Sequence, residues 1–207
     1  MAPRLKFVSP EPEKRTVVRP AGRPPNRRLR IREHLTPAEV ERLIEAAKAN
    51  RQGHRDATMI LIAFRHGLRA SELVDLRWEQ TDLDQAVLHV HRVKNGTPAT
   101  HPLTGRELRA LRKLQRESSE SPFVFVSERD APFSVSGFRR MIERAADGAG
   151  LEIKTHPHML RNATGYALAN KGVDTRTLQA YLGHRNISNT VRYTELAPGR
   201  FKILWKD

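Results

Sequence analysis

The chain has 207 residues, of which 38% are hydrophobic, and its 37 Lys and Arg against 23 Asp and Glu give a formal net charge of +14. This length fits one ordinary domain, alone or with a tail, and the hydrophobic share is enough for a core. The chain has no cysteine, which excludes a disulfide framework, a thiolate zinc site and a cysteine nucleophile. The charge favours nucleic acid as the partner, because Lys and Arg neutralise phosphates, although a solvated basic surface has the same composition.

Neither a membrane nor export is indicated by the sequence. It contains no apolar run of spanning length and no lysine-rich amphipathic helix that would bind a lipid surface. The N-terminus carries basic residues but lacks the apolar stretch of a signal peptide. We therefore expect a cytoplasmic protein that does not contact a membrane.

Residues 1–33 differ in composition from the rest of the chain. They hold six of the 13 prolines, ten Lys or Arg and three acids, which is a net charge of +7. Prolines and like charges favour an extended, disordered segment, and we expect it to bind DNA as a basic arm. An inert linker, or a start codon assigned too far upstream, explains the same composition. The basic run of this arm consists of Arg27, Arg28, Arg30 and Arg32.

The folded part begins with two helix signals. A capping box at Thr36 and Glu39, with proline at the first helical position, predicts an amphipathic helix over about 37–50. A second helix is predicted over about 54–66, and residues 69–76 resume a helical spacing.

From residue 78 to residue 103 the pattern becomes that of strands. The valine-rich, partly alternating residues 86–93 predict a strand, and Asn95 with Gly96 predicts a turn. The turn would place Lys94 at the tip of an antiparallel hairpin.

The remaining chain is mostly helical by pattern. A helix is predicted after its cap at Thr104, residues 123–126 form a short buried run, and helices occupy most of 134–197. Gly172 and Gly183 stand where helices are expected to end. We therefore expect one domain that is mostly α with a small antiparallel β-sheet, an α+β fold.

Several polar residues suit chemistry at phosphorus. Arginine presents a planar fork of donors that matches two phosphate oxygens. Arg69 and Glu72 are three residues apart, as are His158 and Arg161, so each pair shares one face of a helix. Glu72 would orient Arg69 or a histidine instead of contacting the phosphate. The candidate catalytic residues stand in the order Arg69, Lys94, His158, Arg161, His184 and Tyr193.

Tyr193 is the candidate nucleophile of this set. A phenol has an ordinary pKa near 10, so it needs a neighbouring base or a positive site, which His158 and the two arginines would supply. Lys94 would give a proton to the leaving oxygen, and His184 would donate a hydrogen bond to a non-bridging oxygen. Arginine and lysine neutralise the charge in this scheme, so it requires no metal and no cofactor.

The nine histidines raise the question of a metal site. His89 and His91 share one face of the predicted strand, and His156 and His158 flank a proline. Neither pair has a cysteine or a carboxylate placed nearby, so we expect no metal to bind. Residues 82–84, with two aspartates, indicate a turn more than a two-metal nuclease site.

Each candidate taken alone also has a purely structural explanation. Arg69 and Glu72 would make a common surface ion pair, and Lys94 occupies an ordinary hairpin tip. The two histidines suit helix ends, and Tyr193 suits a core. Their combination in one order favours a shared site.

The ordered residues and the segments around them resemble the tyrosine site-specific recombinases of the phage integrase family. The resemblance covers about residues 34–207 and is strongest to the short recombinases that invert fimbrial phase-switch elements. Asn162 departs from it, because many relatives have histidine there, and we expect this change to be tolerated. We expect no separate N-terminal core-binding domain of the kind that larger integrases have. The segments that carry the resemblance are HGLRASEL, HRVKNGTPATHPL, HPHMLRNATGYALANKGVDTRTLQAYLGHRNISNTVRYT and GRF.

The resemblance implies the fold of DNA breaking-rejoining enzymes, with residues 34–207 as the catalytic domain. It also implies that Tyr193 forms a 3′-phosphotyrosine link and frees a 5′-hydroxyl. A hydroxyl of a partner strand then reverses the attack without ATP or metal. The implied partners are double-stranded DNA with specific recombination sites, a homotetramer on synapsed DNA and accessory DNA-bending proteins, at the nucleoid of a bacterium.

The outcome of the reaction stays open between inversion, integration and excision. Without a partner strand, the same chemistry would relax DNA as topoisomerases of type IB do. The alternative function is a DNA-binding regulator on the same fold that no longer cuts. The presence of Glu72 and of all six polar residues argues against that alternative.

Overall fold

The computed structural model describes residues 32–93, 96–117 and 121–195. Most of the predicted basic arm therefore lies outside the described residues, and so does Lys94. The described helices are α2 (Pro37–Lys48), α3 (Gly53–His66), α4 (Ala70–Val74), the 3₁₀ helix η1 (Trp78–Gln80), α5 (Gly105–Glu117), α6 (Val135–Gly148), α7 (Pro157–Asn170), α8 (Thr175–Leu182) and α9 (Ser188–Glu195). The described strands are β1 (Thr81–Asp82), β2 (Val87–Val90) and β3 (Ala99–Pro102).

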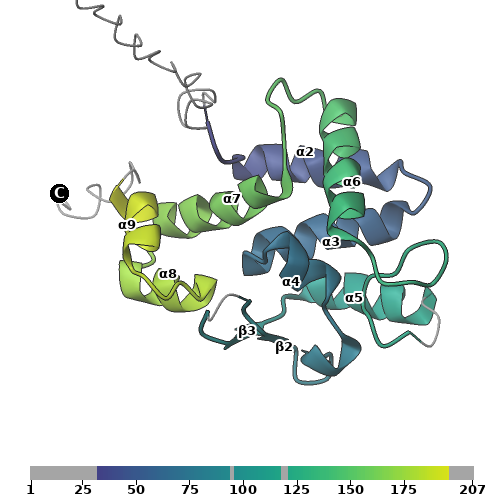
Figure 1. The fold of residues 1–207 in the computed structure, drawn as a ribbon, viewed down its shortest axis with the longest axis horizontal. Coiled ribbons are helices and arrows are strands. Elements are labelled where there is room, and N and C mark those ends of the chain that lie inside the picture. The colour runs from purple at the N-terminus through teal and green to yellow at the C-terminus, as the bar shows by residue number, and fades with distance from the viewer. Residues whose placement is uncertain (1–31, 94–95, 118–120, 196–207) are drawn as a thin grey trace, which may run out of the picture. The chain divides into compact units, whose positions relative to one another are not determined.

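The described chain is mostly helical, with one small sheet, and so confirms the predicted α+β class (Figure 1). The sheet is antiparallel in the order β1-β2-β3, with Leu88 opposite His101 in the second pair of strands. No helix of the described residues is long and apolar enough to cross a membrane.

The helix ends follow the capping signals of the sequence. Before α2, the Thr36 hydroxyl accepts a hydrogen bond from the Glu39 amide at 3.2 Å, and the Glu39 carboxylate accepts one from the Thr36 amide at 2.7 Å. This reciprocal pair satisfies two amides that a helix start leaves without partners. Gly67 ends α3 with φ +56° and Gly183 ends α8 with φ +64°, a left-handed conformation that favours glycine.

The predicted strand over 86–93 is too long at both ends. Ala86 has φ +56° and belongs to the turn before β2, and the strand stops at Val90. Arg92 leaves the sheet because its guanidinium turns into the protein, where it donates to the carbonyls of His66 at 3.1 Å and Tyr181 at 2.6 Å. The chain beyond β2 is thus held by side-chain contacts instead of strand pairing.

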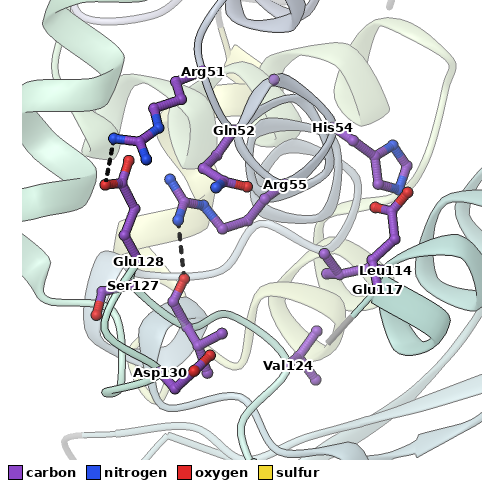
Figure 2. Close-up of a pocket in the computed structure, with 12 residues that line it drawn as sticks. Arg51, Gln52, His54, Arg55, Leu114, Glu117, Val124, Ser127, Glu128 and Asp130 are labelled. Atoms are coloured by element: carbon purple, nitrogen blue, oxygen red, sulfur yellow. Dashed lines mark hydrogen bonds and ion pairs between the residues drawn. The ribbon is translucent and has the colours of Figure 1, made fainter. Parts of the chain in front are cut away.

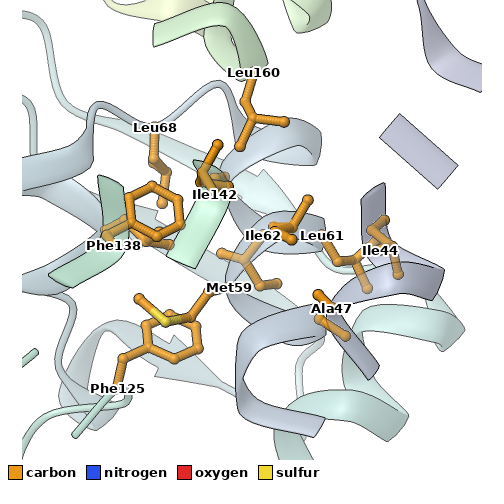
Figure 3. Packing of buried hydrophobic residues seen from close by; sticks show 14 of the residues in the cluster. Ile44, Ala47, Met59, Leu61, Ile62, Leu68, Phe125, Phe138, Ile142 and Leu160 are labelled. Carbon is orange, nitrogen blue, oxygen red and sulfur yellow. The ribbon is translucent and has the colours of Figure 1, made fainter. Parts of the chain in front are cut away.

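The main core surrounds α3, which packs against α2, α5 and α7. Met59 and Ile62 of α3 lie among Phe125, Phe138 and Ile142 (Figure 3), and all of these side chains are buried. Of the run predicted to be buried at 123–126, Val124 and Phe125 are buried, whereas Phe123 and Val126 are partly exposed. The close packing makes α3 a rigid centre.

A smaller cluster joins the last three helices. Ala169 of α7, Leu178 and Leu182 of α8 and Tyr193 of α9 are buried together. Because α7 also packs on α3, this cluster fixes α8 and α9 beside the end of α3. That junction brings together most of the polar residues predicted from the sequence.

Candidate functional site

A buried carboxylate, that of Glu72, lies at the centre of the junction. It accepts hydrogen bonds from the main-chain amide of Arg69 at 2.9 Å and from the Arg69 guanidinium at 2.5 Å. It also accepts from Arg92 Nη1 at 2.9 Å and from the amide of Val93 at 3.2 Å. Burial alone would raise the pKa of Glu72, but the Arg69 amide and the charge of Arg92 bring that pKa below its ordinary value. Glu72 is therefore a charged hub.

Arg92 is the residue of this hub that the sequence did not single out. Its side chain is completely buried, and besides Glu72 it binds three main-chain carbonyls, those of His66, Gly67 and Tyr181. These contacts tie the end of α3 to α8 and to the segment after β2. In sequence Arg92 looks like any arginine of an exposed strand, and no local pattern distinguishes it.

Gly183 permits this arrangement. A Cβ atom on Gly183 would lie 2.7 Å from Arg92 Cγ and 2.9 Å from the carbonyl oxygen of Thr97. The glycine was predicted for its helix-ending conformation, and the close approach of Arg92 is a second reason for it.

Arg161 reaches the same place from α7. Its Nη1 donates to the Gly67 carbonyl and its Nη2 to the Leu182 carbonyl at 2.6 Å. Its Nη1 lies 4.0 Å from Glu72 Oε2. Burial, and then repulsion from Arg69 and Arg92, lowers the pKa of Arg161 to about 9, so that it remains charged at neutral pH.

The described site therefore has an excess of positive charge. The guanidinium groups of Arg69, Arg92 and Arg161 lie around one carboxylate, that of Glu72. Arg69 and His184 line an open pocket of about 550 Å³ on the surface. An anion in this pocket would relieve the repulsion among the arginines.

Both predicted histidines are neutral at physiological pH. Burial, followed by the charges of Arg161 and Arg69, lowers the pKa of His184 to about 3. Loss of water around the ring, followed by the charges of Arg161 and Arg192, lowers the pKa of His158 to about 4, although the residue is exposed. His184 Nδ1 lies 2.8 Å from the Thr190 hydroxyl. When Thr190 donates to Nδ1, the neutral ring carries its hydrogen on Nε2 and can donate it to a ligand.

Tyr193 lies in the smaller core cluster, with only 1% of its surface exposed. Its hydroxyl donates to Asn162 Oδ1 at 2.9 Å and accepts from Arg192 Nη2 at 3.0 Å. The ring lies 6.3 Å from the ring of His184, centre to centre. The predicted nucleophile is thus next to the site, but its oxygen is turned to Asn162.

Three residues around Tyr193 were not predicted to contact it. Asn162 was expected only to be a tolerated substitution, and Arg192 was not considered. Gly165 lets the ring approach α7, because a Cβ atom there would lie 2.8 Å from the Tyr193 ring. The sequence offered one signal, a glycine within a helix, which often marks such a close approach.

The structure thus brings six of the predicted residues to one junction, from α4, α7, α8 and α9 and their ends. Arg69, Glu72 and Arg161 share the charged hub, His184 borders it, and His158 is at the start of α7. Tyr193 is adjacent but covered, and Lys94 lies outside the described residues, one position after Val93.

A second cavity, of about 450 Å³, lies at the start of α3, at the opposite end of that helix from Gly67 (Figure 2). Its two arginines already have partners. Arg51 pairs with Glu128 at 3.1 Å, and Arg55 donates to the carbonyl of Val126 at 3.0 Å. The described residues contain no group of three or more acidic or histidine side chains suited to a metal ion. We assign no chemistry to this cavity.

The lowered pKa values give a prediction about pH. As the pH falls from about 7 to 5, His158 and His184 should stay neutral in the folded chain, whereas histidines of the unfolded chain take up protons near pH 6.5. The unfolded chain then binds more protons, so the free energy of unfolding should fall as the pH falls. Histidine ring signals in NMR spectra measure this directly. A His184 signal with a midpoint near pH 6.5 contradicts the structure.

Known proteins resemble the chain in sequence and in fold. A model described as the phage integrase family matches residues 33–200. The type 1 fimbriae regulatory protein FimB of Escherichia coli strain K12 is 42% identical over 179 residues, covering 84% of this chain and 90% of that protein. The tyrosine recombinase XerD of Ralstonia nicotianae is 32% identical over 209 residues, covering 97% of this chain and 66% of that protein.

Among solved structures, the crystal structure of XerA recombinase superposes with a TM-score of 0.72 and 27% identity. The superposition covers 83% of this chain and 63% of the XerA chain. The matched residues 33–200 include the six predicted catalytic residues and Glu72, but not the arginines of the predicted arm.

Proposed function

The chain belongs to the phage integrase family, and we propose that it cuts and rejoins double-stranded DNA at specific sites with Tyr193 as the nucleophile. It is thereby a tyrosine recombinase. One observation carries the proposal: three guanidinium groups surround a single buried carboxylate beside an open pocket. The ring of Tyr193 lies 6.3 Å from the ring of His184, which lines that pocket. Such a site attracts a phosphodiester and stabilises charge on its oxygens.

In the first step, Arg69, Arg161 and His184 hold the non-bridging oxygens of the scissile phosphate. The Tyr193 oxygen attacks phosphorus and forms a 3′-phosphotyrosine bond, while the bond from phosphorus to the 5′ oxygen breaks. Neutral His158 takes the phenolic proton, and Lys94 gives a proton to the departing 5′ oxygen.

In the second step, the 5′-hydroxyl of a partner strand attacks the phosphotyrosine and Tyr193 leaves. One phosphodiester bond is consumed and one is formed, so the exchange requires no ATP. Glu72 serves both steps by holding Arg69 and, through Val93, the chain that leads to Lys94.

For this chemistry the phenol must become accessible. Tyr193 is 1% exposed and hydrogen-bonded to Asn162, so α9 has to shift before a docked phosphate can reach it. The same burial is the observation that favours the alternative function, a DNA-binding regulator that does not cut.

We further assign the chain a synaptic homotetramer with two protomers cutting at a time, helped by DNA-bending proteins at the bacterial nucleoid. The likeness to FimB, a type 1 fimbriae regulatory protein, supports the inversion of a phase-switch element more than integration or excision. Residues 34–207 would form the catalytic domain and residues 1–33 a DNA-binding arm.

A trapping experiment tests the nucleophile. On a nicked suicide duplex with the cognate site, the wild-type chain should form a covalent complex on a denaturing gel, and Tyr193→Phe should not. Tyr166→Phe removes a neighbouring phenol and should still form it. Arg69→Ala should slow the reaction by about 100-fold or more, with DNA binding largely kept. A complex that persists in Tyr193→Phe refutes the assignment, and a wild-type chain that only binds supports the regulator.

A salt titration tests the arm. Replacing the three arginines of residues 27–30 by alanine should weaken DNA binding and lower the slope of log K against log salt by about 2–3, because each lost phosphate contact lowers it by about 0.9. Replacing three of the basic residues of α5, Arg112, Lys113 and Arg116, removes the same charge and should change the slope less. Equal slopes for wild type and the arm variant contradict DNA binding by the arm.

A further inference from the structure

The segment before α2, residues 32–35, is held in place by contacts that converge on Tyr193. We call it the N-terminal latch. Its first residue, Arg32, pairs with Glu39 at 2.5 Å, and the carbonyl of Glu33 accepts a hydrogen bond from Asn162 Nδ2 at 2.8 Å. The ring of His34 lies 4.0 Å from the ring of Tyr166, centre to centre. Leu35 is buried in the main core.

Two residues that contact the latch, Asn162 and Tyr166, also contact Tyr193. Asn162, which donates to the latch, accepts the hydrogen bond of the Tyr193 hydroxyl at 2.9 Å. Tyr166, whose ring is tilted by 34° from that of His34, meets the Tyr193 ring edge-on, with the centres 5.0 Å apart and the planes at 86°. The latch therefore contacts two of the neighbours of Tyr193, Asn162 through a hydrogen bond and Tyr166 through a ring.

The amide of Asn162 has a hydrogen-bonding partner for each of its two ends. Its nitrogen donates to Glu33, and its oxygen accepts from Tyr193 and, at 2.8 Å, from Arg192 Nη2. An amide oxygen can accept from a phenol but has no hydrogen to offer a phenolate. The contact therefore engages the phenolic hydrogen and directs the phenol to Asn162.

We propose that Asn162 is a positioning residue that, together with the N-terminal latch, holds Tyr193 in a covered, unreactive state until the latch is displaced. The proposal rests on the proposed function in so far as Tyr193 is the nucleophile. Displacement of residues 32–35 removes the donor partner of Asn162 and the ring that supports Tyr166. The phenol then loses its restraint, and α9 can carry it toward the pocket lined by Arg69 and His184.

Chemical modification without DNA tests the restraint. The chain has three tyrosines, Tyr166, Tyr181 and Tyr193, and trypsin places each in a different peptide. With N-acetylimidazole, Asn162→Ala and His34→Ala should each raise the acetylation rate of Tyr193 by about fivefold, the factor expected for one lost hydrogen bond or ring contact. The rate for Tyr181, whose hydroxyl donates to the Arg65 carbonyl at 2.8 Å, should not change.

The matched control is Thr164→Val. Thr164 is buried on α7 like Asn162 and donates to the carbonyls of Phe64 and Leu160, so its loss perturbs the same helix without touching Tyr193. This variant should leave the acetylation of Tyr193 unchanged even if the chain becomes less stable. His34 is only half-buried, so His34→Ala tests the latch without opening the core.

The covalent trapping assay supplies the functional result. Asn162→Ala and His34→Ala should form the covalent DNA complex about fivefold faster than the wild-type chain. Unchanged acetylation of Tyr193 in both variants overturns the proposal, and so does a folded Asn162→Ala that no longer cleaves. If the wild-type chain forms no covalent complex at all, the proposed function fails while the acetylation test still decides the restraint.

Discussion

The buried carboxylate of Glu72 is the group on which the rest of this structure depends. It is enclosed by Arg69, Arg92 and the amide of Val93, with Arg161 at the edge of contact. A buried charge left without its partner is strongly destabilising, so the carboxylate and the arginines require one another. Through Arg92 this pairing fixes the end of α3, the end of α8 and the chain beyond β2 relative to one another.

The same pairing also leaves a charge imbalance on which the proposed function depends. Arginine guanidinium groups outnumber carboxylates at the described hub, and carbonyl groups such as that of Gly67 satisfy several of their donors without neutralising them. A phosphodiester in the pocket lined by Arg69 and His184 would supply the missing negative charge. Fold stability and the proposed phosphate binding would then have one electrostatic cause.

Much of this could be predicted from the sequence, because it depends on local signals. The capping box at Thr36, the glycines that end α3 and α8, and the order of the polar residues were all visible in short segments. Contacts distant in sequence were not. Asn162 meets Glu33 across 129 residues and Tyr193 across 31, and Arg92 meets the Tyr181 carbonyl across 89. The burial of Arg92, the early end of β2 and the covered state of Tyr193 follow from such contacts.

The central claim is that this positively charged hub serves a tyrosine that becomes covalently joined to DNA. Mass spectrometry of the peptide linked to a cleaved DNA strand tests it most directly. We predict that, after trypsin and nuclease digestion, the nucleotide is attached to the peptide of residues 193–200, at Tyr193. Attachment to the peptide of Tyr166 or of Tyr181 would contradict the claim.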